Sequence, residues 1–243
     1  MKTTIFLPDT KNKWFLFFLL CAASLSAQTG TKNYIKATEY LGETADPNSA
    51  VITVQYYDGL GRPDQTVSVK ATPNGKDIIT KIEYDEFGRQ TRDYLPVPTS
   101  QSSGNFISDP NSIYTGYYGT GTAYNTEVFY SEKELESSPL GRVMKQAAPG
   151  DDWELKNGHE IQFDYQTNSA ADNIRMFMIS LNEDFEPTLG EWGSFSAGLL
   201  YKTITTDENG HTIEEFKTKL GLIILKRTFQ GTDTLDTYYV YDN

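Results

Sequence analysis

A short pattern of residues recurs in this chain at a fixed spacing, and this repetition constrains the fold more than any other feature of the sequence. The pattern is Tyr-Asp-x-x-Gly-Arg. Its two clearest copies consist of Tyr57, Asp58, Gly61 and Arg62, and of Tyr84, Asp85, Gly88 and Arg89. The tyrosines and the glycines of the two copies are both 27 residues apart (84 − 57 and 88 − 61). A constant period is typical of repeat architectures, in which each copy forms the same small unit of structure.

The residue types of this pattern predict a tight turn between two strands. A tyrosine at the end of a strand packs its ring on a half-buried sheet surface. The aspartate can accept a hydrogen bond from the backbone N–H two residues later, and the glycine adopts the positive φ that closes a type I turn with a bulge. The arginine then begins the return strand, with its guanidinium expected in water. A catalytic acid–base pair of Asp58 and Arg62 is disfavoured, because no nucleophile accompanies them.

A weaker third copy of the pattern follows after about two further periods. It consists of Pro139, Leu140, Gly141 and Arg142. The glycine lies 53 residues after that of the second copy (141 − 88). The arginines of the second and third copies are each followed seven residues later by a proline (96 − 89 and 149 − 142), which supports a true duplication.

Two later glycines, Gly210 and Gly221, mark predicted turns in which the arginine is missing. A histidine follows the first glycine and a leucine follows the second, so the pattern is eroded there. The last three residues, 241–243, read Tyr-Asp-Asn, which is the first half of another copy. We therefore expect that the natural protein continues or that the gene is truncated within a further repeat.

The repeated residues resemble those of the RHS/YD-repeat proteins of bacteria, whose repeat core is Tyr-Asp-x-x-Gly-Arg. The stretch 33–243 is similar to the uncharacterised domain that precedes RHS repeats in exported Gram-negative proteins. The resemblance implies a sheet that spirals into a shell, with downstream RHS repeats of the same polypeptide as the partner. In relatives such a shell can enclose a C-terminal toxin that an aspartyl-protease-like core releases. This chain contains neither part, so no residue takes a catalytic role from the resemblance.

Composition agrees with a mainly β fold of antiparallel hairpins and meanders with minimal helix. Aromatic residues make up 13% of the 243 residues, with 16 tyrosines against 3 tryptophans, and tyrosine, threonine and glycine favour strands and turns. The formal net charge of −12 argues against sequence-independent nucleic-acid binding and against docking on anionic lipid. Calcium binding is an alternative explanation of the acidity, but no twelve-residue calcium loop is present.

The first 27 residues have the features of a secretory signal peptide. Basic residues precede an apolar run at 14–25, and Ser26, Ala27 and Gln28 follow it. The run has 12 residues (25 − 14 + 1), too few to span a bilayer, and the small residue before the polar one predicts cleavage after Ala27. The predicted location is therefore outside the cell or on the surface of a Gram-negative bacterium, without a transmembrane span in the mature chain.

Cys21 is the only cysteine and lies within this leader. A lipoprotein acylated on Cys21 is an alternative, but Leu20 is larger than the residue that normally precedes such a site. After cleavage the chain has no cysteine, so we expect core packing alone to hold the exported protein together.

The mature chain divides into a polar amino-terminal arm at 28–50 and a β-rich domain at 51–243. We expect a long loop or weak strands in the insertion at 99–127, a short helix at 131–137 with Ser131 as its N-cap, and a loop at 183–197. Buried strands are predicted at 161–165 and 174–181. A meander of strands follows from 199 to 241, with turns after each strand.

Few residues carry recognisable chemistry. The two histidines, His159 and His211, lack zinc-ligand spacing, and the glycine-rich 116–121 stretch lacks the lysine and helix of a phosphate loop. The run Asp151, Asp152, Trp153 and Glu154 places carboxylates beside an aromatic ring, as sugar-binding sites do.

We therefore expect a non-enzymatic structural domain, without cofactor or metal, that starts or caps the β-shell of an RHS-repeat protein. A polymorphic-toxin or intercellular-competition system is one setting for it. The alternative is a surface carbohydrate- or protein-binding module that uses the tyrosine-rich segment 114–130 and the region of Trp153. The least favoured hypothesis is that the chain is an unrecognised hydrolase.

Overall fold

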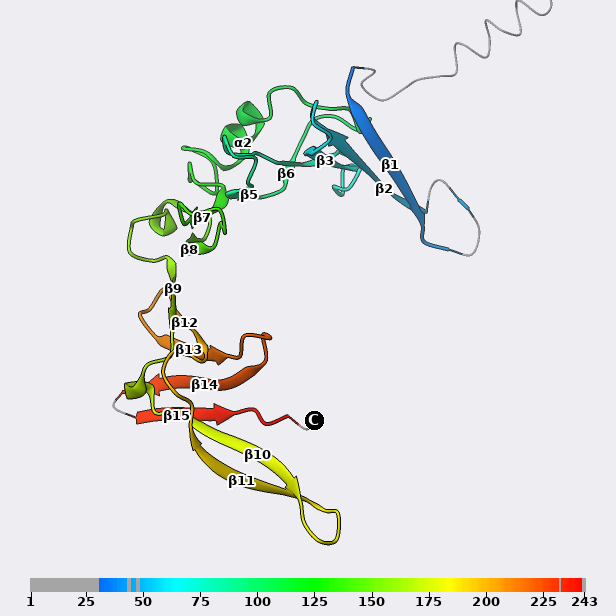
Figure 1. Ribbon diagram of the computed structural model, residues 1–243. Helices are drawn as coiled ribbons and strands as arrows, with labels where there is room; N and C mark the ends of the chain where they lie inside the picture. Colours follow the sequence, from blue (N-terminus) through cyan, green and yellow to red (C-terminus); the bar gives the residue numbers. More distant parts are fainter. Residues whose placement is uncertain (1–30, 43–44, 47–48, 232, 242–243) are drawn as a thin grey trace, which may run out of the picture. The chain divides into compact units, whose positions relative to one another are not determined.

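The computed structural model describes residues 31–42, 45–46, 49–231 and 233–241 (Figure 1). The predicted signal peptide at 1–27, with Cys21, lies outside the described residues, as do the last two residues of the chain. Strands hold 45% of the residues and helices 7%, so the protein is mainly β. The chain forms two compact units. The first contains the described residues up to Lys81 together with Pro96–Ile113, and the second contains Ile82–Leu95 and the described residues from Tyr114 onward.

The first unit is built on a five-stranded antiparallel sheet with the order β1-β2-β3-β4-β6. Its strands are β1 (Asn33–Tyr40), β2 (Ala50–Tyr57), β3 (Pro63–Val69), β4 (Ile78–Lys81) and β6 (Val97–Pro98). Alternation places one set of side chains in a common core, where the solvent-exposed fraction is 0%: Val54, Tyr56, Val67, Ile79 and Val97. The segment 28–50 was expected to be an arm. Residues Asn33–Tyr40 instead pair with β2 along its whole length, as an edge strand of the sheet.

Buried polar side chains tie the loop after β6 to this sheet. The Tyr56 hydroxyl donates to the carbonyl of Gly104 (2.8 Å), and the Gln65 amide both donates to and accepts from the backbone of Ile107 (3.1 and 3.0 Å). The carboxylate of Asp77, 1% exposed, accepts from the N–H groups of Lys70 (2.8 Å) and Gly104 (2.7 Å). Because buried polar groups cost free energy unless they are paired, these bonds hold the loop against the sheet.

The second unit contains an eight-stranded antiparallel sheet with the order β15-β14-β13-β12-β9-β8-β7-β5. Its strands are β5 (Arg92–Tyr94), β7 (Tyr130–Leu135), β8 (Val143–Ala147), β9 (Ile161–Thr167), β12 (Tyr201–Thr206), β13 (Thr212–Lys217), β14 (Ile223–Gln230) and β15 (Asp233–Tyr238). A separate hairpin is formed by β10 (Arg175–Leu181) and β11 (Pro187–Ser194). Short 3-10 turns occur at Asp151–Trp153 and Ala170–Asp172.

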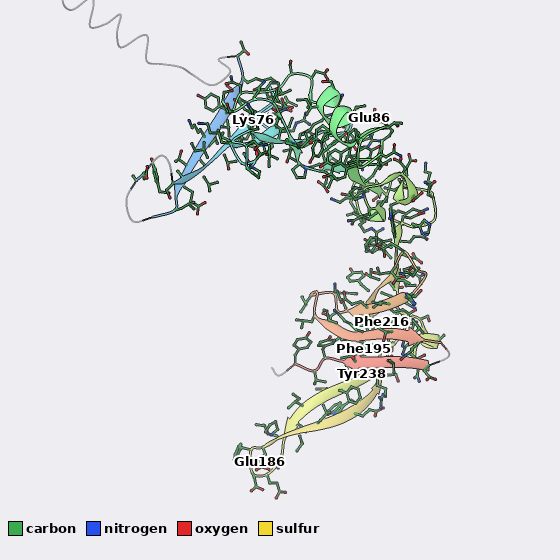
Figure 2. All side chains as sticks on the ribbon, turned by 180° about the vertical axis from the view of Figure 1, so that it is seen from behind. Lys76, Glu86, Glu186, Phe195, Phe216 and Tyr238 are labelled. Carbon is green, nitrogen blue, oxygen red and sulfur yellow. The ribbon has the colours of Figure 1, made fainter. Side chains whose placement is uncertain are left out.

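This second unit has two centres of packing. In the first, Ile174, Leu200, Phe216 and Leu225 are buried, and Phe195 and Tyr238 pack against them (Figure 2). In the second, the part of helix α2 (Asn111–Tyr118) from Tyr114 onward brings buried tyrosines against neighbouring rings. The members of this aromatic cluster are Tyr94, Tyr114, Tyr118, Phe129 and Tyr130, with neighbouring ring centroids 5.1–6.3 Å apart.

Helix α2 was not predicted, because its sequence contains a glycine and several tyrosines that favour strands. Its tyrosines at 114 and 118 are four residues apart, so one helical face delivers both into the aromatic cluster. Tertiary burial therefore outweighs local propensity in this part of the 99–127 insertion.

The prediction of a helix at 131–137 is wrong, because residues 131–135 belong to strand β7 and residues 136–137 begin the turn that follows it. Its glutamates and lysine suit a helix, but they pair across strands instead. Glu132 lies 2.8 Å from Arg92 and Lys133 lies 2.7 Å from Asp93, both on β5. Cross-strand pairs of opposite charge stabilise a sheet, so the neighbours of this segment decide its structure.

The expected loop at 183–197 is also a strand in large part, since β11 occupies Pro187–Ser194. It pairs with β10 in a hairpin whose tip holds Glu186 (Figure 2). The strand predicted at 174–181 exists, but most of its side chains are half-buried or exposed, with Leu181 63% exposed. The strand at 161–165 extends to Thr167 and is likewise only partly buried.

Candidate functional site

Asp58 organises the turn between β2 and β3 through both its backbone and its carboxylate. Its N–H donates to the carbonyl of Arg62 (2.9 Å), and the N–H of Gly61 donates back to the Asp58 carbonyl (3.1 Å). One carboxylate oxygen accepts from the N–H groups of Leu60 and Arg62, both at 2.9 Å. Gly61 has φ of 78°, and the ladder shifts register beside it between Tyr56 and Tyr57. The predicted type of turn, with its bulge, is confirmed here.

The second copy repeats this geometry almost atom for atom. Asp85 and Arg89 exchange the same backbone bond at 2.9 Å, and the Asp85 carboxylate accepts from the N–H groups of Phe87 (2.9 Å) and Arg89 (2.8 Å). Gly88 also has φ of 78°. The tyrosines that precede both turns, Tyr57 and Tyr84, are half-buried, as the sequence predicted.

The arginine side chains stay 35% exposed, but the sequence did not predict the partner that each guanidinium finds in its own turn. Nε of Arg62 donates to the second carboxylate oxygen of Asp58 at 2.8 Å, and Nη2 lies at the same distance from it. Arg89 makes the same contacts with Asp85. The guanidinium therefore closes its own turn. Its two N–H groups bind the carboxylate oxygen of the aspartate that the backbone N–H groups leave free.

The third copy closes its turn with a carboxylate from a different position. Serine occupies position 138, where the other copies have aspartate, and Gly141 has φ of 60°. Arg142 instead donates to Glu136, with Nη2 2.8 Å from the carboxylate. A Cβ atom on Gly141 would lie 4.0 Å from the Cδ of Arg89, so the second and third turns are neighbours. Both lie at the same ends of strands β5, β7 and β8.

The eroded copies keep the turn and lose the arginine. Gly210 has φ of 82° and Gly221 has φ of 86°. Asp207 accepts from the N–H of His211 (2.8 Å), whose ring is 72% exposed, and the Thr218 hydroxyl accepts from the N–H of Leu222 (3.2 Å). The antiparallel order places the turn at 218–222 at the same end of the sheet as the turns at 85–89 and 136–142, and the turn at 207–211 at the opposite end.

Two further turns of this type were missed as copies of the pattern. The first, at 72–76, has Thr72 in place of aspartate, and its hydroxyl accepts from the N–H of Lys76 (2.7 Å). The second, at 182–186, has Asn182 first and Phe185 in the glycine position with φ of 60°. A sequence search that also allowed threonine three residues before the glycine would have found the first turn, since Thr72 precedes Gly75 at this spacing. The second lacks the glycine signal altogether.

The turn carboxylates are held ionised by the bonds they accept. The N–H of Arg62 lowers the pKa of Asp58, and the N–H of Arg89 does the same for Asp85. The guanidinium of Arg142 lowers the pKa of Glu136 to about 2. A general acid or base works best when its pKa lies near the operating pH, so these groups are suited to holding a turn rather than to transferring protons.

A second candidate site is a hollow of about 590 Å³ within the second unit. Its walls come from the tyrosine-rich segment 114–130 and from the turn at Asp151–Trp153, the two regions that the sequence analysis assigned to one alternative binding module. The residues that line it are Leu95, Tyr118, Tyr124, Asn125, Thr126, Val128, Pro149, Gly150, Asp151, Asp152 and Trp153. The structure therefore joins two stretches that are far apart along the chain.

Asp151 anchors one wall of this hollow to the other. One of its carboxylate oxygens accepts from the hydroxyl of Thr126 (2.7 Å) and from the N–H groups of Glu127 (2.9 Å) and Val128 (3.1 Å). The Thr126 hydroxyl bond lowers the pKa of Asp151, with the two backbone bonds adding to it. Gly150, with φ of 116°, lets the ring of Trp153 approach the backbone, where a Cβ would lie 3.3 Å from it.

The two aromatic rings at the mouth of the hollow remain accessible. Trp153 is 41% exposed and Tyr124 is 57% exposed. His159 packs on Trp153 with ring centroids 5.3 Å apart, and Tyr117 packs on Tyr124 at 5.2 Å. These neighbours fix the orientation of both exposed rings, which is the usual requirement for a surface that stacks on a ligand.

Metal ligation finds no support in the described part of the chain. No group of three or more His, Cys, Asp or Glu side chains converges there in a way that could hold an ion. His159 and His211 lie in separate places, on Trp153 and on Asp207. No helix within the described ranges has the length and apolar character that crossing a membrane requires.

Fold and site together define a mainly β protein whose antiparallel hairpins are closed by one recurring turn and carry one aromatic hollow. Residues 30–167 match the profile of a family described as a domain of unknown function, DUF6443. The match covers 138 residues (167 − 30 + 1), more than half of the chain, and the protein belongs to this family. No protein of curated function has a sequence that matches the chain.

Proposed function

We propose that this chain is a non-enzymatic structural domain that starts or caps the β-shell of an exported RHS-repeat protein. The observation that carries the proposal is the closure of each motif on itself. In the two complete copies the aspartate accepts bonds from its own turn and the arginine returns to that aspartate. The charged residues are thus used for shape, which supports a structural role for the motif.

The arrangement of successive turns also supports this proposal. The second and third turns lie at one end of the same sheet, and their residues Phe87, Arg89, Ser137, Ser138 and Pro139 line a common hollow. A repeat protein grows when each unit stacks on the one before it, so neighbouring turns at one end of a sheet are its expected signature.

The sheet edges give the domain places to which more strands can be added. Among the strands that the structure describes, β1 in the first unit pairs with β2 alone, and β15 in the second pairs with β14 alone. Nearly all side chains of β15 are exposed, including Leu235 at 52%. An open edge presents unpaired N–H and C=O groups, which a further strand of the same polypeptide would satisfy. Downstream repeats are therefore the proposed partner, and the predicted leader at 1–27 is the proposed route of export.

Hydrogen exchange at β15 tests the proposal. The chain at 28–243 would be compared with a longer protein that also carries the sequence that follows it in the genome. We expect the outward-facing amides of β15 to exchange quickly in the shorter protein and at least 10-fold more slowly in the longer one. The amides of β13, in the interior of the sheet, serve as the internal control. Equal exchange of β15 in both proteins would refute the capping role.

A further inference from the structure

We infer that the aromatic hollow of the second unit binds a neutral saccharide. Trp153 and Tyr124 offer accessible ring faces at its mouth, and the site is formed from two stretches that the fold brings together. The inference stands apart from the proposed structural role, because it depends on this hollow and not on the repeated turns.

The exposed rings favour a ligand with a flat apolar face. The faces of aromatic rings carry negative electrostatic potential, and a pyranose ring presents a face of C–H groups that stacks against such a surface. Their neighbours, His159 and Tyr117, hold Trp153 and Tyr124 in place before any ligand arrives. A preorganised aromatic surface loses little conformational entropy on binding, which favours recognition of an otherwise well-hydrated sugar.

Polar atoms in the same hollow are available for hydroxyl groups. Among the described residues, the carboxylate of Asp152 and the indole N–H of Trp153 have no hydrogen-bond partner. The Asn125 side chain uses its oxygen to accept from the N–H of Gly121 (3.0 Å), which turns its amide N–H₂ to other acceptors. One carboxylate and two N–H donors match hydroxyl groups, which both donate and accept. A concave site with aromatic walls and a few polar groups is typical of small-ligand binding.

Charge selects a neutral sugar over an acidic one. Asp151 and Asp152 line the hollow, Glu127 and Glu154 follow nearby in sequence, and the chain carries a formal charge of −12. An anionic saccharide would bring like charge into this site, and such juxtaposition is costly. The ligand class is therefore an uncharged oligosaccharide, held by stacking on Trp153 and by hydroxyl contacts with Asp152.

The test uses the full chain and a defined set of oligosaccharides. The neutral probes are hexasaccharides with the linkages of maltose, cellulose, xylan, mannan and chitin. The acidic probe is oligogalacturonate. Each is immobilised, and binding is compared for the wild type, Trp153→Ala, Asp152→Asn and the matched control Trp192→Ala. Trp192 is 64% exposed on β11 and does not line the hollow, so its removal controls for loss of a surface indole.

We expect the wild type and Trp192→Ala to bind at least one neutral probe equally and to leave oligogalacturonate unbound. Trp153→Ala should weaken binding at least 10-fold. Asp152→Asn, whose side chain has no contact to lose in the described structure, should weaken it about threefold without changing the melting temperature. Absence of binding to every probe, or equal binding by Trp153→Ala and Trp192→Ala, would overturn the inference.

Discussion

Arg142 binds the carboxylate of Glu136, six residues before it. In the first two motif turns the arginine binds an aspartate four residues before it. Both Nε and Nη2 of Arg142 lie within 3.1 Å of this carboxylate. Glu136 also accepts from the hydroxyl of Ser138 (2.8 Å), which stands where the other copies have aspartate. The arginine and its acceptor are thus retained in space although the sequence pattern is broken, so the contact itself is what the turn requires.

The first prediction concerns acid stability at this contact. The pKa of Glu136 falls from 4.5 to about 2 in the folded state because Arg142 binds the ionised form. Its contribution to stability is therefore complete above pH 4.5 and is lost as the pH falls towards 2. Glu136→Gln should lower the melting temperature at pH 7 and show a smaller further loss than the wild type between pH 4.5 and 2.

The matched control for this experiment is Glu86→Gln. Glu86 is exposed in the second motif turn, and no ion pair involves it in the described structure (Figure 2). Its melting temperature should follow the wild-type curve across the same pH range. A Glu136→Gln curve that parallels the wild type down to pH 2 would show that the contact with Arg142 is not stabilising.

The second prediction concerns backbone conformation in the first motif turn. Gly61 has φ of 78°, whereas Gly59 in the same turn lies outside the positive-φ region. Gly61→Ala should destabilise the protein by about 1–2 kcal/mol, because Cβ penalises the left-handed conformation. Gly59→Ala should be neutral or stabilise by up to about 1 kcal/mol, because it restricts the unfolded chain.

Apart from the flanking residues, no atom of the described residues lies within 4 Å of a Cβ placed at either glycine, so crowding does not separate the two substitutions. Urea unfolding monitored by circular dichroism measures both. Similar losses of stability in the two variants would argue against a φ-based role for Gly61.

The third prediction concerns the buried carboxylate that fixes the loop after β6. Asp77→Ala removes the acceptor of the N–H groups of Lys70 and Gly104 and leaves both donors unpaired. We expect a loss of about 1–3 kcal/mol, together with faster proteolytic cleavage within 99–107. Asp109→Ala is the control, since Asp109 lies on the same chain segment and no side-chain bond involves it in the described residues. Unchanged cleavage in Asp77→Ala would mean that other contacts hold the loop.

The fourth prediction concerns a lysine in the interior of the second unit. Lys202 is 8% exposed, and its Nζ lies 2.8 Å from Asp172 and 2.7 Å from Glu214. Lys202→Met removes the cation that these two carboxylates share and leaves Arg227, 3.9 Å from Glu214, as their neighbouring charge. The expected cost is on the order of 3 kcal/mol. Lys133→Met removes a surface ion pair with Asp93 and should cost less than about 1 kcal/mol.

Salt dependence separates these two lysines further. The Lys133 pair should weaken at 0.5 M salt because solvent-exposed charges are screened, while the Lys202 contribution should persist. Thermal unfolding of both variants at low and high salt gives the comparison. Equal costs for the two substitutions would mean that Lys202 is better hydrated than the structure places it.

The motif turns were predictable because their causes are local. All the hydrogen bonds of each turn form within five consecutive residues, from the aspartate to the residue after the glycine. The turns at Asp58 and Asp85 can therefore be predicted without tertiary information. The ion pair of Arg62 with Asp58 was missed for a different reason. Propensity rules describe where an arginine stem packs, and they do not say that its own turn presents an acceptor.

The other differences arise from partners that are distant in sequence. Residues 131–137 have helical propensity, but β5 and β8 on either side impose a strand on residues 131–135. Helix α2 forms against propensity because Tyr94 and Phe129 receive its tyrosines. The hollow depends on the contact of Asp151 with Thr126, 25 residues earlier in the chain, which no local pattern encodes. Trp153 and the segment 114–130 could be singled out from sequence, but the contact that joins them could not.

Amide exchange across the turn at 85–89, measured residue by residue by NMR, tests most directly whether the repeated motif is a turn built for shape. The N–H groups of Phe87, Gly88 and Arg89 have acceptors, whereas that of Glu86 has none among the described residues. We predict slow exchange at the first three and fast exchange at Glu86. In Asp85→Ala, protection should be lost at Phe87 and Arg89 and kept at Gly88, which donates to a backbone carbonyl. Protection of Glu86 equal to that of Gly88, or no effect of Asp85→Ala, would contradict the turn.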